Sequence, residues 1–339
     1  MMYSTVDLLL AQVWQVTILI ILALLIERLF AVKFPHLMAG VWLAVVIKCL
    51  VPPILSSPTG LFSWARVSLT TGTAEVAAQS LGSIPRMIGI TLLLLWAGGA
   101  IFLTASWFYR WRRFANCLKT CKQHPILQER VDQLRLEIGL KNRPSLFVSR
   151  DNMGPLTTGI LRPIILLPES LVSVSNLKQL DPVIAHELIH IRRRDSLLGV
   201  FQMVATLFFW FHPLLRLAMK RMDLNIERCV DSEVISDLKY DATEYAKGLL
   251  HVLKLNTGLP IMRGLAYMSP KQISKDRIRH VITSAHARSR IRGPFFVVAM
   301  ILLIVPGHPL DSHPWQPDLK LPFSVCKTDS TNSNHQSID

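Results

Sequence analysis

The sequence has few charged residues and few cysteines for its length. Only 18% of its 339 residues are charged, whereas 50% are hydrophobic, and its five cysteines are scattered along the chain. Cysteines this sparse do not form the disulfide framework of a small secreted domain. The high apolar content also excludes intrinsic disorder over most of the chain, because it suffices to bury a core. The composition is that of a membrane protein.

Long apolar runs predict membrane spans. Residues 8–26 carry no charge and nearly reach the roughly 20 residues that a helix needs to cross a bilayer. Residues 37–55 form a second run, which Lys48 interrupts, and residues 87–108 form the clearest span, with basic residues directly after it. A 13-residue run, 294–306, is short for a crossing, and we expect it to be a fourth span.

Acidic residues are scarce relative to basic ones, and the excess of basic residues lies in one block. The chain has 37 Lys and Arg against 23 Asp and Glu, a net charge of +14. Residues 110–293 hold 30 of the basic and 16 of the acidic residues, so the whole net charge lies there. Because basic segments stay in the cytoplasm, this block is expected inside, and the loop 56–86 and the tail 307–339 outside. The polar tail is expected to be disordered.

Within the cytoplasmic block the pattern predicts an α+β domain. Residues 127–140 show the periodicity of an amphipathic helix. Residues 145–149 and 156–167 are β-like, with turn residues at 159–163, and the pattern becomes helical from Leu177 onward.

The strongest functional signal is the sequence HELIH that begins at His186. On a helix, His186 and His190 lie one turn apart on the same face, so both imidazoles can bind one Zn²⁺. Glu187 can approach a metal-bound water and take its proton. We expect this helix to begin with Asp181 as its N-cap and Pro182 at its first helical position.

A third metal ligand is needed, and several residues compete for that role. The metzincin pattern would require His at position 196, where Ser196 stands. Glu227 lies on a predicted helix and would bind zinc, and Asp231, one turn later, would orient a ligand imidazole. The competing candidates are Asp195, Asp223, Glu233 and His212. Of these, Asp195 fits better as the N-cap of the apolar helix that follows it.

The metal site also limits the topology of the apolar run 197–217. If His190 before this run and Glu227 after it bind one ion, an odd number of membrane crossings between them is excluded. The run therefore lies along the membrane surface, re-enters the bilayer, or packs into the protein core.

Taken together, these motifs resemble a known family. The stretch HELIHIRRRD, the apolar run that ends in WFHP at residues 210–213, and the following IERCVD are similar to the BlaR/MecR-type antirepressors, which are integral-membrane metallopeptidases. The upstream block 154–169 and the spans before it also match, so that the resemblance covers roughly residues 5–306.

The resemblance implies a gluzincin-like zinc peptidase domain. It implies His186, His190 and Glu227 as the zinc ligands and Glu187 as the catalytic base. In this family the peptidase acts on the path that inactivates a cytoplasmic DNA-binding repressor, so such a repressor is the implied protein substrate. Residues 155–168 would form the edge strand of the active site, on which a substrate strand could add. No direct contact with nucleic acid is expected.

One departure from the family is large. Its penicillin-sensing members carry an extracellular sensor domain with an acylated serine after the last span. The tail 307–339 is too short to hold such a domain. A role as a β-lactam receptor is therefore not expected.

The resulting prediction is a multi-span α-helical protein of the inner (cytoplasmic) membrane with a cytoplasmic α+β gluzincin-like metallopeptidase domain. Residues 1–109 would hold three spans, 110–293 the peptidase domain and 294–306 the fourth span. The function is cleavage of a cytoplasmic regulatory protein in signal transduction. The alternatives are a catalytically silent receptor or scaffold of the same fold and a housekeeping membrane protease. The bilayer is an expected partner, and homodimerisation is left open.

Overall fold

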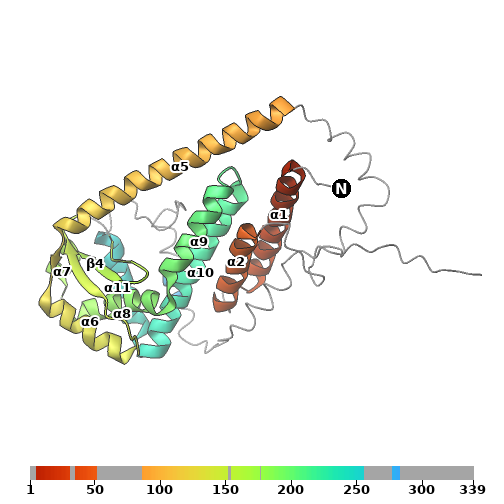
Figure 1. Cartoon of the computed structure of the whole chain (residues 1–339). Helices are drawn as coiled ribbons and strands as arrows, with labels where there is room; N and C mark the ends of the chain where they lie inside the picture. Colours follow the sequence, from red (N-terminus) through yellow and green to blue (C-terminus); the bar gives the residue numbers. More distant parts are fainter. Residues whose placement is uncertain are drawn as a thin grey trace, which may run out of the picture. The chain divides into compact units, whose positions relative to one another are not determined.

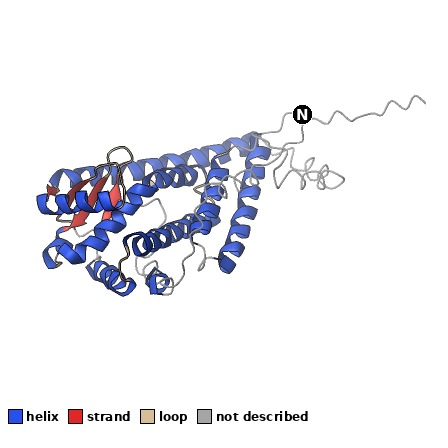
Figure 2. Ribbon diagram, turned by 90° about the horizontal axis from the view of Figure 1, so that it is seen from below, coloured by secondary structure: helices blue, strands red, loops and turns tan. Residues whose placement is uncertain are grey.

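The computed structural model is mostly helical, with one small sheet (Figures 1 and 2). The parts of the chain that it describes are residues 5–30, 35–51, 86–151, 154–175, 177–255 and 277–282. The predicted fourth span, the tail and all but the last residue of the predicted outer loop lie outside the described residues.

Three apolar helices coincide with the three predicted spans. They are α1 (Thr5–Phe30), α2 (Pro35–Leu50) and α5 (Arg86–Thr120). Parts of α1 and α5 are long and apolar enough to cross a membrane, whereas α2 is a shorter apolar helix. Helix α5 continues past Phe108, the predicted end of the third span, because none of the residues that follow is a Gly or Pro that would break a helix. Its apolar stretch is not buried inside the protein.

A short strand lies at each edge of the sheet. Its strands are β1 (Lys122–Gln123), β2 (Ser145–Ser149), β3 (Leu156–Thr158) and β4 (Ile164–Pro168). The order is β1-β2-β4-β3, with β2 and β4 parallel and the other pairs antiparallel. Between β3 and β4, Gly159 has φ +89°, and a Cβ there would collide with the carbonyl oxygen of Arg162. The predicted strands and the turn between them are confirmed. Of the predicted edge strand 155–168 only β3 lies at the edge, because β4 pairs with both β2 and β3.

Six further helices and the short helical segment 277–282 complete the described fold. The six helices are α6 (Pro125–Glu137), α7 (Glu169–Val174), α8 (Leu177–Arg193), α9 (Asp195–Phe208), α10 (Pro213–Leu238) and α11 (Ala242–Leu255). Helix α6 confirms the predicted amphipathic helix, since Leu127, Val131 and Leu134 are buried on one face.

Two hydrophobic cores share helix α10. One core combines α1 and α2 with α9 and the first half of α10, where Met219 and Met222 are buried. The other combines α6, β2, β4, α8 and α11 with the second half of α10, where Val230 and Val234 are buried. Helix α10 therefore connects the apolar N-terminal helices to the domain that carries the HELIH motif.

Helix α8 begins at Leu177, so the predicted start at Asp181 was wrong. Asp181 lies within the helix, and Arg130 of α6 donates to both of its carboxylate oxygens, through Nε and Nη2, at 2.7 Å. Pro182 follows inside the helix. The ion pair and the burial of Leu180 stabilise the extra turn, so tertiary contacts outweigh the local capping signal.

Polar contacts join α10 to the first two helices. Asn225 donates from Nδ2 to Oε1 of Glu27 on α1 at 2.7 Å, and both side chains are buried. His36, near the start of α2, lies 3.9 Å from Glu233 on α10. These contacts fix the position of α10 along the axes of α1 and α2.

We predict that Asn225→Ala lowers the free energy of unfolding by roughly 2 kcal/mol, because the buried Glu27 carboxylate loses a hydrogen-bond donor. Thermal unfolding of detergent-purified protein measures the effect. Asn116→Ala is the matched control, since Asn116 makes an exposed contact with Lys119. Equal melting temperatures for the two variants would contradict a stabilising role of the Asn225 contact.

Candidate metal centre

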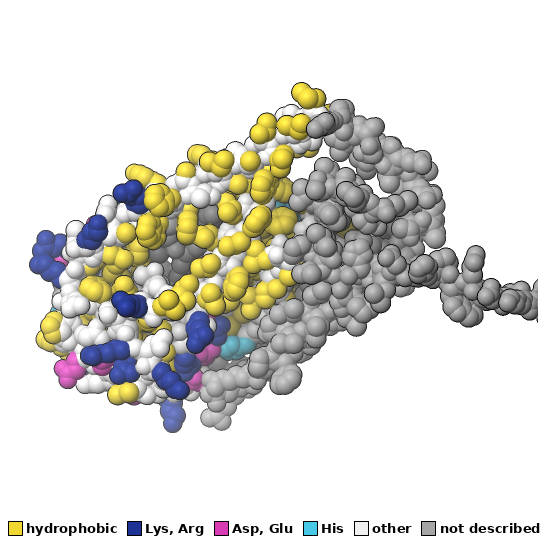
Figure 3. Space-filling model, viewed as in Figure 1, with side chains coloured by type: hydrophobic (Ala, Val, Ile, Leu, Met, Phe, Trp, Pro, Cys, Tyr) yellow, Lys and Arg dark blue, Asp and Glu magenta, His cyan; other side chains and the backbone are white. Residues whose placement is uncertain are grey.

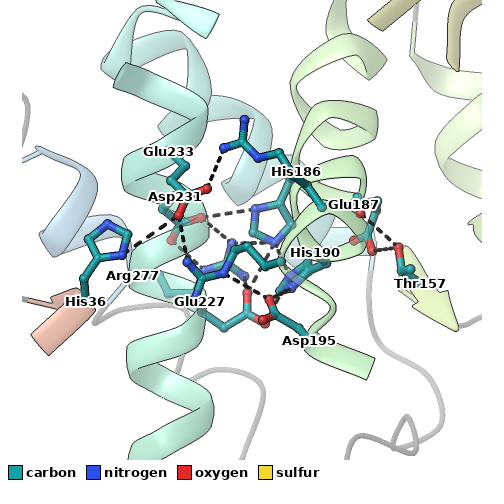
Figure 4. A network of polar contacts seen from close by, with 12 residues as sticks. His36, Thr157, His186, Glu187, His190, Asp195, Glu227, Asp231, Glu233 and Arg277 are labelled. Carbon is teal, nitrogen blue, oxygen red and sulfur yellow. Dashed lines mark hydrogen bonds and ion pairs between the residues drawn. The ribbon is translucent and has the colours of Figure 1, made fainter. Parts of the chain in front are cut away.

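Three buried side chains from two helices bring metal-ligand atoms together. His186 and His190 come from α8 and Glu227 comes from α10 (Figure 4). The two imidazole Nε2 atoms lie 3.2 Å apart. Oε2 of Glu227 lies 3.3 Å from Nε2 of His186, and Oε1 lies 3.7 Å from Nε2 of His190. The structure therefore brings together the three residues that were predicted as metal ligands.

The hydrogen bonds behind the two histidines indicate their tautomers. Nδ1 of His190 lies 2.7 Å from Oδ2 of Asp195, a carboxylate that can only accept, so Nδ1 carries the proton. Nδ1 of His186 lies 2.9 Å from the hydroxyl of Tyr245, which donates its own proton to Asp231 at 2.6 Å. That hydroxyl therefore accepts from Nδ1 of His186.

Both Nε2 atoms consequently present lone pairs to each other and to the carboxylate of Glu227. Such an arrangement favours a cation between the donors, a requirement that the Arg277 guanidinium meets in part, since its Nη2 lies 3.4 Å from Nε2 of His186. Two neutral imidazoles and one carboxylate form the ligand set of many catalytic zinc sites, and partners on the far ring nitrogens fix ligand orientation. The donor set therefore fits a divalent cation of the zinc type.

Asp231 lies behind His186, in a network with Arg277 (Figure 4). Arg277 donates to Oδ2 of Asp231 through Nε at 2.9 Å and to Oδ1 through Nη2 at 2.7 Å. Burial alone would raise the pKa of the Asp231 carboxyl, but Arg277 holds that pKa well below its ordinary value. The predicted orienting role of Asp231 fits this geometry, with Tyr245 as an intermediate hydrogen-bond partner.

Arg277 also reaches a ligand directly. Its Nη1 lies 2.9 Å from Oε2 of Glu227, and it comes from the helical segment 277–282. One guanidinium thus holds both Glu227 and Asp231, which lie one turn apart on α10. No sequence pattern pointed to Arg277 or Tyr245, because both lie outside the motifs along the chain.

The prediction that Asp195 caps α9 was wrong. The N-cap position belongs to Arg194, whose φ is 59°, and Asp195 is the first residue of the helix. The Asp195 carboxylate turns back toward α8, where it bonds His190 and lies 3.4 Å from Nε of Arg193. Its position directly after the motif could have suggested this role.

The other competing candidates lie outside the ligand group. Asp223 accepts from Gln202 at 2.8 Å, and His212 caps α10 by accepting from the N–H of Leu215. Glu233 accepts from two arginines that follow the motif, at 2.6 Å from Arg192 and 2.7 Å from Arg193. This clamp stabilises the end of α8 against α10, and it therefore fixes His190 relative to Glu227.

Glu187 points away from α10, toward the edge strand β3 (Figure 4). The hydroxyl of Thr157 donates to Oε2 of Glu187 at 2.7 Å. Glu187 is buried, so this bond restricts its carboxylate to the space between the strand and the ligand group. An edge strand was predicted here from the sequence, but Thr157 was not identified.

We predict that Asp195→Ala lowers the zinc affinity of the protein about 10–100-fold, because His190 loses the acceptor that fixes its tautomer. Chelator competition on detergent-purified protein measures this affinity. Asp132→Ala is the control, since Asp132 bonds Arg135 and Arg143 away from the centre. An unchanged affinity for Asp195→Ala would show that the contact does not support a ligand.

Comparison with known proteins adds an independent finding. The family described as BlaR1 peptidase M56 matches residues 7–281. The methicillin resistance mecR1 protein of Staphylococcus aureus is 20% identical over 257 residues, which cover 69% of this chain and 44% of that protein. The regulatory protein BlaR1 of Bacillus licheniformis is 32% identical over 85 residues, 25% of this chain and 14% of that protein.

A protease HtpX homolog of Gemmatimonas aurantiaca is 26% identical over 147 residues, 43% of this chain and 48% of that protein. The matched region thus spans less than half the length of each of these three relatives. The family match, in contrast, runs from α1 through the histidine motif to the segment that carries Arg277. The resemblance seen in the sequence is confirmed, and the chain belongs to the BlaR1 peptidase M56 family.

Proposed function

We propose that the protein is an integral-membrane zinc endopeptidase that cleaves a cytoplasmic regulatory protein in signal transduction. The observation that carries this proposal is the convergence of His186, His190 and Glu227, with Glu187 held beside them. Bound zinc would supply Lewis acidity for the scissile carbonyl and for a water molecule. Membership in a peptidase family supports hydrolysis as the reaction.

Glu187 would act as the general base in this proposal. It is adjacent in sequence to His186 but takes no part in the ligand group, and its carboxylate would accept a proton from water. The hydroxyl of Thr157 donates to Oε2 of Glu187, and this hydrogen bond orients the carboxylate. After accepting a proton, Glu187 would deliver it to the leaving amine of the cleaved peptide.

The edge strand β3 would bind the substrate. Among the described strands its one neighbour in the sheet is β4, so the other side of β3 could pair with an extended peptide. Thr157 lies on this strand and bonds Glu187. A peptide that pairs with β3 would therefore pass close to the proposed base.

Other observations support the proposed membrane location and the proposed substrate class. Among the described helices, two are long and apolar enough to span a bilayer, and the excess of basic residues in 110–293 favours a cytoplasmic peptidase domain. The relatives include a methicillin resistance protein and a protein called regulatory, which favours a regulatory substrate over general housekeeping proteolysis. We therefore propose a transcriptional repressor as the target, and the peptidase itself would not contact nucleic acid.

We predict that Glu187→Gln keeps stoichiometric zinc but lowers hydrolysis by about 10²–10⁴-fold, because a carboxamide cannot accept a proton from water. Metal analysis and quantitative proteomics of cells that express the protein with its genomic neighbours measure the two effects. Glu169→Gln is the control, since the side chain of Glu169 is exposed and lies in α7. Equal loss of the target protein with wild type and Glu187→Gln would reject the peptidase and favour a scaffold.

We predict that Glu227→Ala removes bound zinc, because two imidazoles alone hold the ion too weakly to survive dialysis. Metal analysis of the purified variant measures occupancy, and circular dichroism checks that the helices remain. Asp223→Ala provides the comparison, since Asp223 was a competing candidate that accepts from Gln202 outside the ligand group. Full occupancy in Glu227→Ala would place the third ligand elsewhere.

A further inference from the structure

Helix α9, the turn after it and the first half of α10 form a hairpin of apolar composition, residues 195–226. Between Asp195 and Lys220 its only charged residue is Arg216. Helix α9 has 14 residues, and at about 1.5 Å per residue it is roughly 21 Å long. This length is too short to cross a hydrocarbon layer of about 30 Å, but it exceeds half of that thickness.

The tip of the hairpin contacts the centre of the first predicted span. Nδ1 of His212 accepts from the N–H of Leu215, so its Nε2 carries a proton and donates to the hydroxyl of Thr17 at 3.0 Å. Thr17 is the middle residue of the predicted span 8–26. The tip therefore lies at mid-depth of that span.

The same tip contacts the third predicted span, again near its centre. Nε1 of Trp96 donates to the carbonyl of Phe208 at 2.9 Å, and Nε1 of Trp210 donates to the carbonyl of Trp96 at 3.3 Å. At Gly99 a Cβ would collide with the indole of Trp210, so glycine permits this close approach. Trp96 and Gly99 lie near the middle of the span 87–108.

The base of the hairpin lies at the inner end of the spans. Asn225 bonds Glu27, the first residue after the span 8–26. From Thr17 to Glu27 the helix rises by about 15 Å, which is half the thickness of the hydrocarbon layer. Glu227 follows Asn225 by two residues, so the metal centre lies level with the inner boundary.

The outer face of the hairpin is apolar and exposed. Figure 3 shows hydrophobic side chains gathered over α5 and α9, whereas charged side chains gather over the end of the molecule that holds the sheet. The exposed apolar residues of α9 and the turn are Leu197, Val200, Phe201, Phe208 and Phe211. They continue the exposed apolar surface of α5, which is itself a predicted span, and lipid chains fit both surfaces.

From these contacts we propose that the hairpin enters the bilayer from the cytoplasmic side, turns at its centre and returns, with lipid acyl chains against α9. Two half-crossings keep His190 and Glu227 on the same side of the membrane. Arg216 is exposed, and its Nη2 donates to the carbonyl of Trp210 at 2.9 Å. Charges within a membrane are commonly paired with backbone carbonyls in this way. The proposal does not depend on peptidase activity.

Spin labels on the full-length protein in phospholipid nanodiscs test the proposal. Single cysteines replace Leu197, Phe201 or Phe208 after the native cysteines are changed to Ala. The collision rate of each label with oxygen, which concentrates in the bilayer, is compared with its collision rate with a water-soluble nickel chelate. The ratio of the two rates reports the depth of the label in the bilayer. Leu95, exposed on α5, is the lipid reference, and Leu161, exposed between β3 and β4, is the aqueous reference.

We expect the ratio of oxygen to nickel collisions to rise from Leu197 through Phe201 to Phe208, where it matches Leu95 and is several-fold higher than at Leu161. A label at Phe211, also exposed, repeats the measurement if the Phe208 variant does not fold. Equal shallow depths at all sites would place the hairpin along the membrane surface and overturn the proposal. Ratios like that of Leu161 would place it outside the bilayer and overturn it as well.

Discussion

The described structure depends on holding two imidazole Nε2 atoms 3.2 Å apart beside a buried carboxylate. These donors belong to α8 and α10, so the two helices must keep a fixed distance and rotation. The clamp from Arg192 and Arg193 to Glu233 provides this at one end, and the shared core around Val230 provides it along the helices. Ligand geometry is thus a consequence of helix packing, because neither helix could position the site alone.

Helix α10 links this site to the apolar helices. Its first half packs with α1 and α2, and its second half carries Glu227 and Asp231 in the other core. Because a helix is stiff over this length, a shift of α2 against α10 would also move Glu227 relative to His186. The structure therefore offers a direct mechanical path between the predicted spans and the site, with Asn225 and Glu233 as its polar contacts.

Local patterns in the sequence predicted the parts of the fold that depend on local periodicity. The helices around His186 and Glu227 and the strands before them follow from spacing and composition, since one helical turn or one strand is a short-range property. Asp181 was wrongly predicted as a cap because it bonds Arg130, which only the tertiary fold brings near. Asp195 was wrongly predicted as a cap because its carboxylate bonds His190, five residues earlier in the chain. Thr157, Tyr245 and Arg277 were missed because their partners are 14 to 91 residues away in the chain, beyond the reach of a local pattern.

The charges around the site show why so many acidic groups can be buried together. Glu187, Asp195, Glu227 and Asp231 are buried or nearly so within one network. Arg277 balances one of these carboxylates and Arg193 lies beside another, although Arg193 is shared with Glu233. Buried carboxylates remain ionised only where positive charge compensates them. A divalent cation between His186, His190 and Glu227 would supply further positive charge to this acidic network.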